Sequence, residues 1–369
     1  MVRRLLYING LAIIAVVMFH AAGMGFVAMF FWYQRYAGGM ITPGMWVGTP
    51  AYFGLRFIEQ VIVFAIPAFL FVSGYSIAIA TGKNQQTVSW KLIFSRMRYL
   101  VIPYLIWTTV VLLLNILEMK TISLPVILLA FLIGNSNEVL YFVPLLLQFY
   151  LISPFLVRWA RQNWKILLLV TAVLQILVQL SSYPEFLGLN SPFFDMLSRL
   201  TPKWFFLSRI FWFPLGIVCG FHPVELRQRF TPFRLALLVV TVLLIPIGIA
   251  EWELYYQLSG QEWLSHRETL LDSLFTITLL LSVLTLEEKS LLWLNPIGRL
   301  GSKSYGIYLT HAIFIQYTAR LIYHFAPGLL GYPLLLQSLL IAVGFGIPLA
   351  LMALVDHSPF RRYYSYLYG

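Results

Sequence analysis

Long apolar stretches recur from one end of this 369-residue chain to the other, and they restrict its fold more than any other feature. About 20 apolar residues are enough to cross the hydrocarbon core of a bilayer as a helix. Ten such stretches occur, at residues 5–30, 56–80, 99–118, 139–157, 165–181, 204–221, 233–251, 269–286, 304–324 and 331–355. The sequence therefore predicts an all-α, polytopic integral membrane bundle of about ten transmembrane helices.

The composition excludes a soluble globular protein, because too few side chains are polar enough to face water. Charged residues make up 11% of the chain and hydrophobic residues 60%, with a mean hydropathy of +0.82. A soluble domain carries about 25% charged residues. The net charge of +11 does not indicate nucleic-acid binding, since the basic residues are spread over many short loops. The single Cys219 excludes an intramolecular disulfide and a cysteine metal site.

The basic residues of the loops predict the orientation. With the N-terminus in the cytoplasm, 17 of the 25 Lys and Arg residues fall on the cytoplasmic side, in agreement with the positive-inside rule. The other eight, Arg56 among them, lie outside or near outer helix ends. An even number of spans places both termini in the cytoplasm. We expect one domain, residues 1–369, in the cell (cytoplasmic) membrane, and its first helix is retained and not cleaved as a signal peptide.

One apolar stretch does not fit this pattern of spans. Residues 121–134 (TISLPVILLAFLIG) are too few to cross the bilayer comfortably. They predict an interfacial or re-entrant segment.

A histidine interrupts the first apolar stretch. His20 lies 16 residues after Arg4, roughly 24 Å along a helix and beyond the midplane of the membrane. Asn9 precedes it by eleven residues, about three turns, so the two side chains share one helical face. An ionisable group at this depth is costly unless it is paired, hydrated or useful. Two interpretations stay open here: a neutral histidine bonded to a neighbouring helix, or a group with a chemical role.

Further segments carry polar residues at or near membrane depth. In 63–80, Pro67 and the pair Ser73-Gly74 predict either a broken helix that lines a cavity or an ordinary kink with close packing. Arg96 and Arg98 start the third span, where they hold topology or donate to phosphate.

The later segments add an aromatic start and a second imidazole. Tyr141 opens an aromatic stretch that fits the outer interface. His311 lies seven residues into the ninth span and is expected nearer the cytoplasmic side than His20. No carboxylate accompanies these histidines at ligand spacing, so no metal site is expected.

Taken in order, these segments resemble the membrane-bound acyltransferase-3 family, which O-acylates polysaccharides and related cell-envelope molecules. The matching stretches are AVVMFH ending at His20, IPAFLFVSGY, RMRYLVIPY, YFVPLLLQFYLISP and GSKSYGIYLTH ending at His311. They span nearly the whole chain. One position departs from the family pattern, because Asn9 stands where the family has an arginine. Arg4 and Arg98 are the cations that can take over its role.

The resemblance implies a mechanism and a set of site residues. Acetyl-CoA or another acyl-CoA is expected as co-substrate, with no bound cofactor, and Arg96 and Arg98 as its phosphate ligands. His20, with Asn9 beside it in the catalytic set, is expected to act as general base on a hydroxyl of a carbohydrate or other envelope acceptor. Ser73, Tyr141 and His311 are further site candidates. Membrane lipid is an expected partner and nucleic acid is not.

Two other functions remain open from the sequence. A transporter or flippase for an envelope glycan or lipid-linked precursor also needs intramembrane polar residues, broken helices and a basic cytoplasmic face. A catalytically inactive relative that serves as a scaffold is the third interpretation. Consumption of an acyl thioester distinguishes the enzyme from both.

Overall fold

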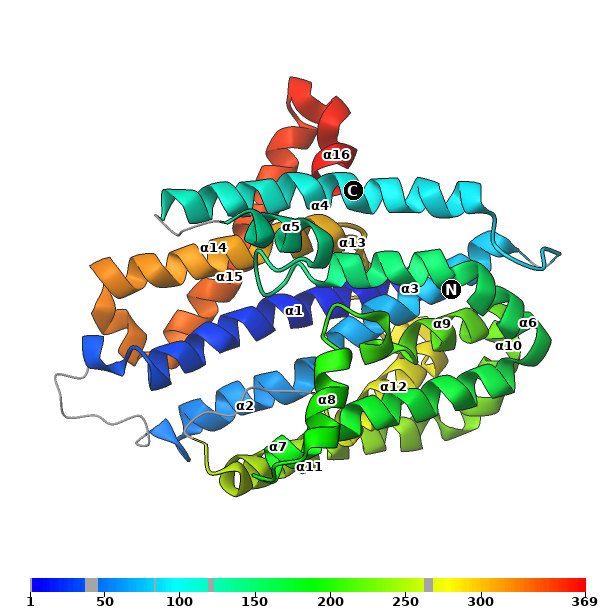
Figure 1. Ribbon diagram of the computed structural model, residues 1–369, viewed down its shortest axis with the longest axis horizontal. Helices are drawn as coiled ribbons and strands as arrows, with labels where there is room; N and C mark the ends of the chain where they lie inside the picture. The colour runs from blue at the N-terminus through cyan, green and yellow to red at the C-terminus, as the bar shows by residue number, and fades with distance from the viewer. Residues whose placement is uncertain (1, 37–45, 83, 119–122, 262–267) are drawn as a thin grey trace.

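The computed structural model describes residues 2–36, 46–82, 84–118, 123–261 and 268–369, and within these ranges the regular structure is helical. The longer helices lie side by side in one bundle (Figure 1). The α-helices are α1 Val2–Phe30, α2 Pro50–Ile62, α3 Ala65–Thr81, α4 Trp90–Leu117, α5 Leu124–Ile133, α6 Phe142–Leu180, α7 Tyr183–Phe186, α8 Pro192–Leu200, α9 Trp212–Phe221, α10 Pro223–Phe230, α11 Arg234–Ser259, α12 Leu270–Thr285, α13 Leu294–Ser302, α14 Ser304–Phe325, α15 Pro333–Asp356 and α16 Tyr364–Tyr368. Short 3₁₀ turns join them at Tyr33–Arg35, Phe206–Arg209, Thr231–Phe233, Glu288–Ser290, Pro327–Gly331 and Pro359–Tyr363.

Six stretches of the described chain are long and apolar enough to cross a membrane. They are Val2–Phe30, Pro50–Thr81, Trp90–Leu117, Phe142–Phe186, Pro223–Ser259 and Pro333–Asp356. The multi-pass helical fold predicted from the sequence is thus confirmed. The predicted spans 204–221, 269–286 and 304–324 do not meet the same criterion, so the number ten and the orientation of the termini stay predictions.

The fourth of these stretches contains two predicted spans. At Asn163 the backbone leaves the helical region, with φ −149° and ψ 68°, and this residue interrupts α6. The interruption falls between the predicted spans 139–157 and 165–181. Because of this break, the two parts of α6 can run in different directions and form two separate spans.

Helix α1 is the centre of the bundle. It packs against α2, α3, α13, α14 and α15 (Figure 1). Ile8, Ile13, Val17 and Met29 are all at most 1% exposed. A helix that is apolar on nearly every face is stable only when other helices surround it or lipid does. Here other helices cover much of it, and of its polar side chains Arg4 is buried while Asn9 and His20 are partly buried.

The second predicted span is divided by its proline. Helix α2 ends at Ile62 and α3 begins at Ala65, with Val63 between them. Pro67 has no N–H to donate to the carbonyl four residues earlier, which is that of Val63, and its ring crowds this carbonyl. The break therefore sits where the proline's missing hydrogen bond would have been.

The short apolar segment near residue 130 does not span. Helix α5 has ten residues, about 15 Å of helix, which is half of the hydrocarbon thickness. It ends at Gly134 in the left-handed conformation (φ 75°), and the Tyr104 hydroxyl donates to the Ala130 carbonyl at 2.8 Å. The prediction of a non-spanning segment for 121–134 is confirmed over residues 123–134, whereas residues 121 and 122 lie outside the described ones.

Helices α3 and α9 approach each other through glycine. A Cβ on Gly74 would overlap the carbonyl oxygen of Phe213, and a Cβ on Gly216 would overlap that of Phe71. Small residues of this kind let helix backbones come close in a membrane, where packing replaces the hydrophobic driving force. The structure combines features of both alternatives: the helix is broken before Pro67 and α3 lines a cavity, whereas at Gly74 itself the helix continues and packs closely on α9.

We predict that Gly74→Ala destabilises the protein by about 1–3 kcal/mol, the usual cost of overpacking. Gly54 in α2 is the matched control, because no atom lies within 4 Å of a Cβ added there. Gly54→Ala should be neutral or stabilising by up to about 1 kcal/mol. The melting temperatures of both variants, purified in detergent, check this. Equal melting temperatures would contradict the packing argument.

Candidate active site

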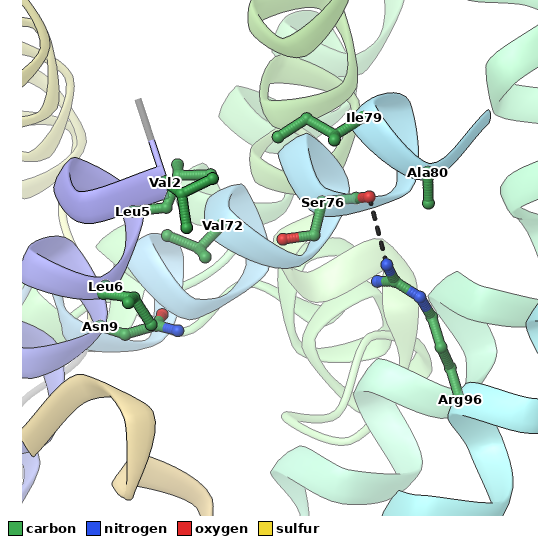
Figure 2. A pocket seen from close by; sticks show the side chains of 9 residues that line it. All are labelled: Val2, Leu5, Leu6, Asn9, Val72, Ser76, Ile79, Ala80 and Arg96. Carbon is green, nitrogen blue, oxygen red and sulfur yellow. Dashed lines mark hydrogen bonds between the residues drawn. The ribbon is translucent and has the colours of Figure 1, made fainter. Parts of the chain in front are cut away.

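A cavity of about 260 Å³ lies between α1, α3 and α4 near the N-terminal end of α1. Figure 2 shows Asn9 entering from α1, Ser76 from α3 and Arg96 from α4. Most of its other lining is aliphatic. The cavity therefore joins Asn9 and Arg96, two site candidates that lie 87 residues apart in the sequence.

The polar groups of this cavity are incompletely bonded. The Arg96 guanidinium donates one hydrogen bond, from Nη2 to the Ser76 carbonyl at 3.3 Å (Figure 2). The buried Oδ1 of Asn9 accepts no hydrogen bond within the described chain. An arginine has five N–H donors, so most of the hydrogen-bonding capacity of Arg96 remains for another group.

Arg98 does not line this cavity. Its Nη2 donates to the Tyr366 hydroxyl at 3.5 Å, at an exposed position. Residues two apart on an α-helix point in directions about 200° apart. The expected pair of donor ligands is thus divided by helix geometry, and Arg96 alone faces the cavity.

Two more sequence candidates lie outside this lining. Ser73 is half-buried on α3, one residue beyond Val72, which does line the cavity. Arg4 is buried and donates to the Leu284 carbonyl, with Glu288 3.7 Å from its Nε. The guanidinium of Arg4 is thereby bonded to the end of α12 and does not line the cavity that contains Asn9.

The two intramembrane histidines come together. The ring centroids of His20 and His311 are 5.2 Å apart, and the ring planes make an angle of 53°. The prediction that His311 lies nearer the cytoplasmic side than His20 put the two rings at different depths, and their contact contradicts that separation. It assumed that α1 and α14 start at one level, whereas α13 packs along the first turns of α1 and α14 begins only beyond it. Among the described residues, no group of three His, Cys, Asp or Glu side chains is placed to hold a metal ion. The two rings are called the imidazole pair below.

His311 is held in one tautomer by its own helix. Its Nδ1 lies 3.0 Å from the Ile307 carbonyl and 2.8 Å from the Tyr308 carbonyl. Carbonyls only accept, so Nδ1 carries the hydrogen and the neutral ring presents a lone pair at Nε2. Nε2 is buried and makes no hydrogen bond to the described residues. Such an atom costs about 1–3 kcal/mol, which suggests that a partner joins it in another state.

Tyrosines continue this polar region away from α1. The Tyr308 ring lies 6.2 Å from His311 and 5.5 Å from Phe142, the neighbour of Tyr141. The Tyr308 hydroxyl donates to the Val139 carbonyl. The guanidinium carbon of Arg209 lies 5.8 Å from the Tyr141 ring centroid. Tyr141 is thus connected to His311 only through its neighbour Phe142 and through Tyr308 in the contacts of the described residues.

A second buried polar cluster escaped the sequence analysis. Arg56, assigned above to the outer side, is 3% exposed and pairs through Nη1 with Glu59 Oε2 at 2.7 Å. Its Nε donates to the Tyr52 hydroxyl at 3.0 Å, and Gln60 donates to Asp272 at 3.0 Å. The spacing of 52, 56 and 59 along one helix face is the signal that reveals it.

Most of the chain is similar in sequence to known proteins. The sequence model of the family described as "Acyltransferase domain" matches residues 5–355. A protein of Staphylococcus aureus (strain MRSA252) named probable poly-beta-1,6-N-acetyl-D-glucosamine export protein is 25% identical over 270 residues, 70% of this chain and 71% of that protein. A protein of the same name from Staphylococcus epidermidis is 25% identical over 271 residues, 70% of each chain. No solved structure matches significantly.

We predict that Asn9→Arg folds with a melting temperature close to that of the unchanged protein, because the cavity at Asn9 has room for a longer side chain. The matched control is Ile13→Arg, one turn further along α1, where the side chain is fully buried. An unpaired charge there should destabilise by several kcal/mol. Thermal unfolding in detergent compares the two. Loss of folded Asn9→Arg would show that the cavity does not accept the arginine.

Proposed function

Because this chain belongs to the acyltransferase-domain family, and is therefore a membrane acyltransferase, we propose that it O-acylates a cell-envelope carbohydrate. The donor is an acyl-CoA, with acetyl-CoA as the first choice, bound from the cytoplasm. The acceptor is a hydroxyl that approaches from the outer side. The protein works in the cytoplasmic membrane with both termini in the cytoplasm.

The donor site in this proposal is the cavity between α1, α3 and α4. Coenzyme A carries phosphates, and a guanidinium with spare N–H donors binds phosphate oxygens well. Arg96 has such donors and faces the cavity. The remaining lining is largely aliphatic, which suits the uncharged arm between the phosphates and the thioester. Arg98 is a weaker candidate, since it faces Tyr366.

The observation that carries the proposal is that the cavity and the imidazole pair lie along one helix. Asn9 borders the cavity, and His20, eleven residues further along α1, meets His311. At 1.5 Å per residue the two positions are about 16 Å apart. A thioester at the end of a long arm can reach inward from phosphates held at Arg96. The reacting carbonyl would then meet the acceptor beside His20.

The chemical step assigns one role to His20. A ring nitrogen of His20 takes the proton of the acceptor hydroxyl as the oxygen bonds to the thioester carbonyl carbon. The carbon–sulfur bond then breaks, and the thiolate leaves with the proton returned by the imidazolium. The products are an ester of the acceptor and free coenzyme A, so no additional reactant is needed.

The relatives suggest the class of acceptor. Their printed name refers to a polymer of β-1,6-linked N-acetylglucosamine. We propose an amino-sugar polysaccharide, or its membrane-bound precursor, as acceptor for this chain.

The same name favours a second candidate function. The relatives are described as probable export proteins, so translocation of a polysaccharide is the alternative. It needs the same multi-pass bundle but no acyl donor. Release of free thiol from acyl-CoA separates the two candidates, because translocation leaves the thioester intact.

We predict that His20→Ala lowers acyl transfer by about 10²–10⁴-fold, the usual contribution of a general base. Thiol release from acetyl-CoA is followed with and without oligomers of β-1,6-N-acetylglucosamine, using protein in nanodiscs. The melting temperature of the variant controls for folding. Unchanged thiol release in His20→Ala would reject the base. No thiol release by the folded unchanged protein would favour export.

We predict that Arg96→Gln raises KM for acetyl-CoA by about tenfold or more, since a charge-assisted contact to phosphate is worth about 1.5–3 kcal/mol. Arg98→Gln should have a smaller effect. Arg3→Gln, an exposed position at the same end of α1, is the control for general loss of positive charge. Initial rates over a range of donor concentrations give the three KM values. Equal values for Arg96→Gln and Arg3→Gln would return Arg96 to a role in topology.

A further inference from the structure

We propose that His311 is the positioning residue of the reaction: its Nε2 accepts a hydrogen bond from one ring nitrogen of His20 while the other ring nitrogen takes the acceptor's proton. This inference rests on the proposed function, because it needs His20 to act as a base. It assigns to a neutral imidazole the task of orienting the base, which a carboxylate performs in many other enzymes.

The lone pair of His311 Nε2 has a direction that the helix fixes. Two backbone carbonyls, of Ile307 and Tyr308, receive the Nδ1 hydrogen of His311. The ring is therefore fixed within its own helix, and Nε2 can only accept while the ring is neutral.

That lone pair has no hydrogen-bond partner among the described residues. His311 is completely buried, and its Nε2 bonds to no described residue. The polar side chain against it is His20. His20 itself is partly accessible, as a base that meets an incoming hydroxyl must be.

The separation of the His20 and His311 rings fits a hydrogen bond between them. A ring nitrogen lies about 1.1 Å from its ring centroid, so two imidazoles joined by an N–H···N bond of about 2.9 Å have centroids about 5 Å apart. The observed separation is 5.2 Å, with the planes inclined by 53°. The rings have the right spacing for the bond, and a rotation of the His20 side chain completes it. Catalytic hydrogen bonds often tighten in this way only when substrate is bound.

Carboxylates orient the catalytic histidine in many enzymes, but the acidic residues Glu59, Glu118 and Glu268 already have other partners. In the described chain, Glu268 is paired with Arg209 at 2.6 Å, and Glu118 is bonded to Tyr317 and Arg320. Glu59 is paired with Arg56. These acids are already paired with cations. By contrast, Nε2 of His311 is an unbonded acceptor beside His20.

The bond would have two effects on the reaction. It fixes the ring of His20 so that the second nitrogen points to the acceptor hydroxyl. It also stabilises the imidazolium that forms when His20 has taken the proton, without any proton passing to His311. Both effects act on the chemical step and leave donor binding unchanged.

The experiment compares two substitutions of His311, each of which replaces the hydrogen-bonding role of one ring nitrogen and removes that of the other. In His311→Asn the amide N–H group can still donate to the carbonyls of Ile307 and Tyr308, but no acceptor remains at the Nε2 position. In His311→Gln the amide oxygen can take the place of Nε2, but the donor at the Nδ1 position is lost. Steady-state thiol release in nanodiscs gives kcat and KM for acetyl-CoA. Thr310→Val is the matched control, since Thr310 is fully buried and bonds only within its own helix, to the Gly306 and Ile307 carbonyls.

A positioning role predicts that His311→Asn lowers kcat by at least about 10- to 100-fold, the loss found when the outer-shell partner of a metal-bound imidazole is removed. KM should not change. His311→Gln should retain more of kcat than His311→Asn, and Thr310→Val should keep nearly all of it. A structural role gives the reverse order, with His311→Asn active and His311→Gln impaired, and this order overturns the inference.

A double variant separates this inference from the proposed function. If His311 acts through His20, His311→Asn should lower the residual rate of His20→Ala no further. An additional loss in that background rejects the positioning role while the base stands. A fully active His20→Ala rejects the proposed function itself, whatever the His311 variants do.

Discussion

The close approach of two short helices to two long ones sets the geometry on which the polar sites depend. A Cβ on Gly301 of α13 would overlap the Leu6 carbonyl of α1, and one on Gly10 would overlap the Ile297 carbonyl. Helices α9 and α3 meet in the same way through Gly216 and Gly74. In a membrane, such backbone contacts supply the packing that hydrophobic burial supplies in water.

The contact of α13 with α1 also places the catalytic candidates. Helix α14 follows α13 after a single residue, Lys303, so the docking of α13 on the first turns of α1 fixes where α14 begins. His311 then lies against His20 and not at a separate depth. The imidazole pair is therefore a consequence of backbone packing several turns away, and a substitution at Gly301 or Gly10 would disturb it.

Buried charged side chains in this bundle form ion pairs, whereas some buried neutral acceptors have no hydrogen-bond partner among the described residues. Arg56 pairs with Glu59, and Arg209 with Glu268. Desolvation makes an unpaired charge costly, which explains why these buried acids and bases have oppositely charged partners. By contrast, Asn9 Oδ1 and His311 Nε2 are buried acceptors without a described partner. Both atoms lie along α1, one at the cavity and one at the imidazole pair, where a substrate or a moving side chain can bond.

The membrane class, a break or kink near Pro67, the non-spanning segment near residue 130 and the family resemblance can be read from the sequence alone. These follow from local properties: the length of an apolar run, the missing N–H of proline and the order of short motifs. It could not determine that Asn9 and Arg96 share a cavity, that Arg98 faces away, or that His20 meets His311. Those depend on which faces of distant helices come together, and glycine contacts between α1 and α13 and between α3 and α9 decide that. A buried pair such as Arg56–Glu59 was missed for the same reason, because counting charges per loop ignores which side of a helix they occupy.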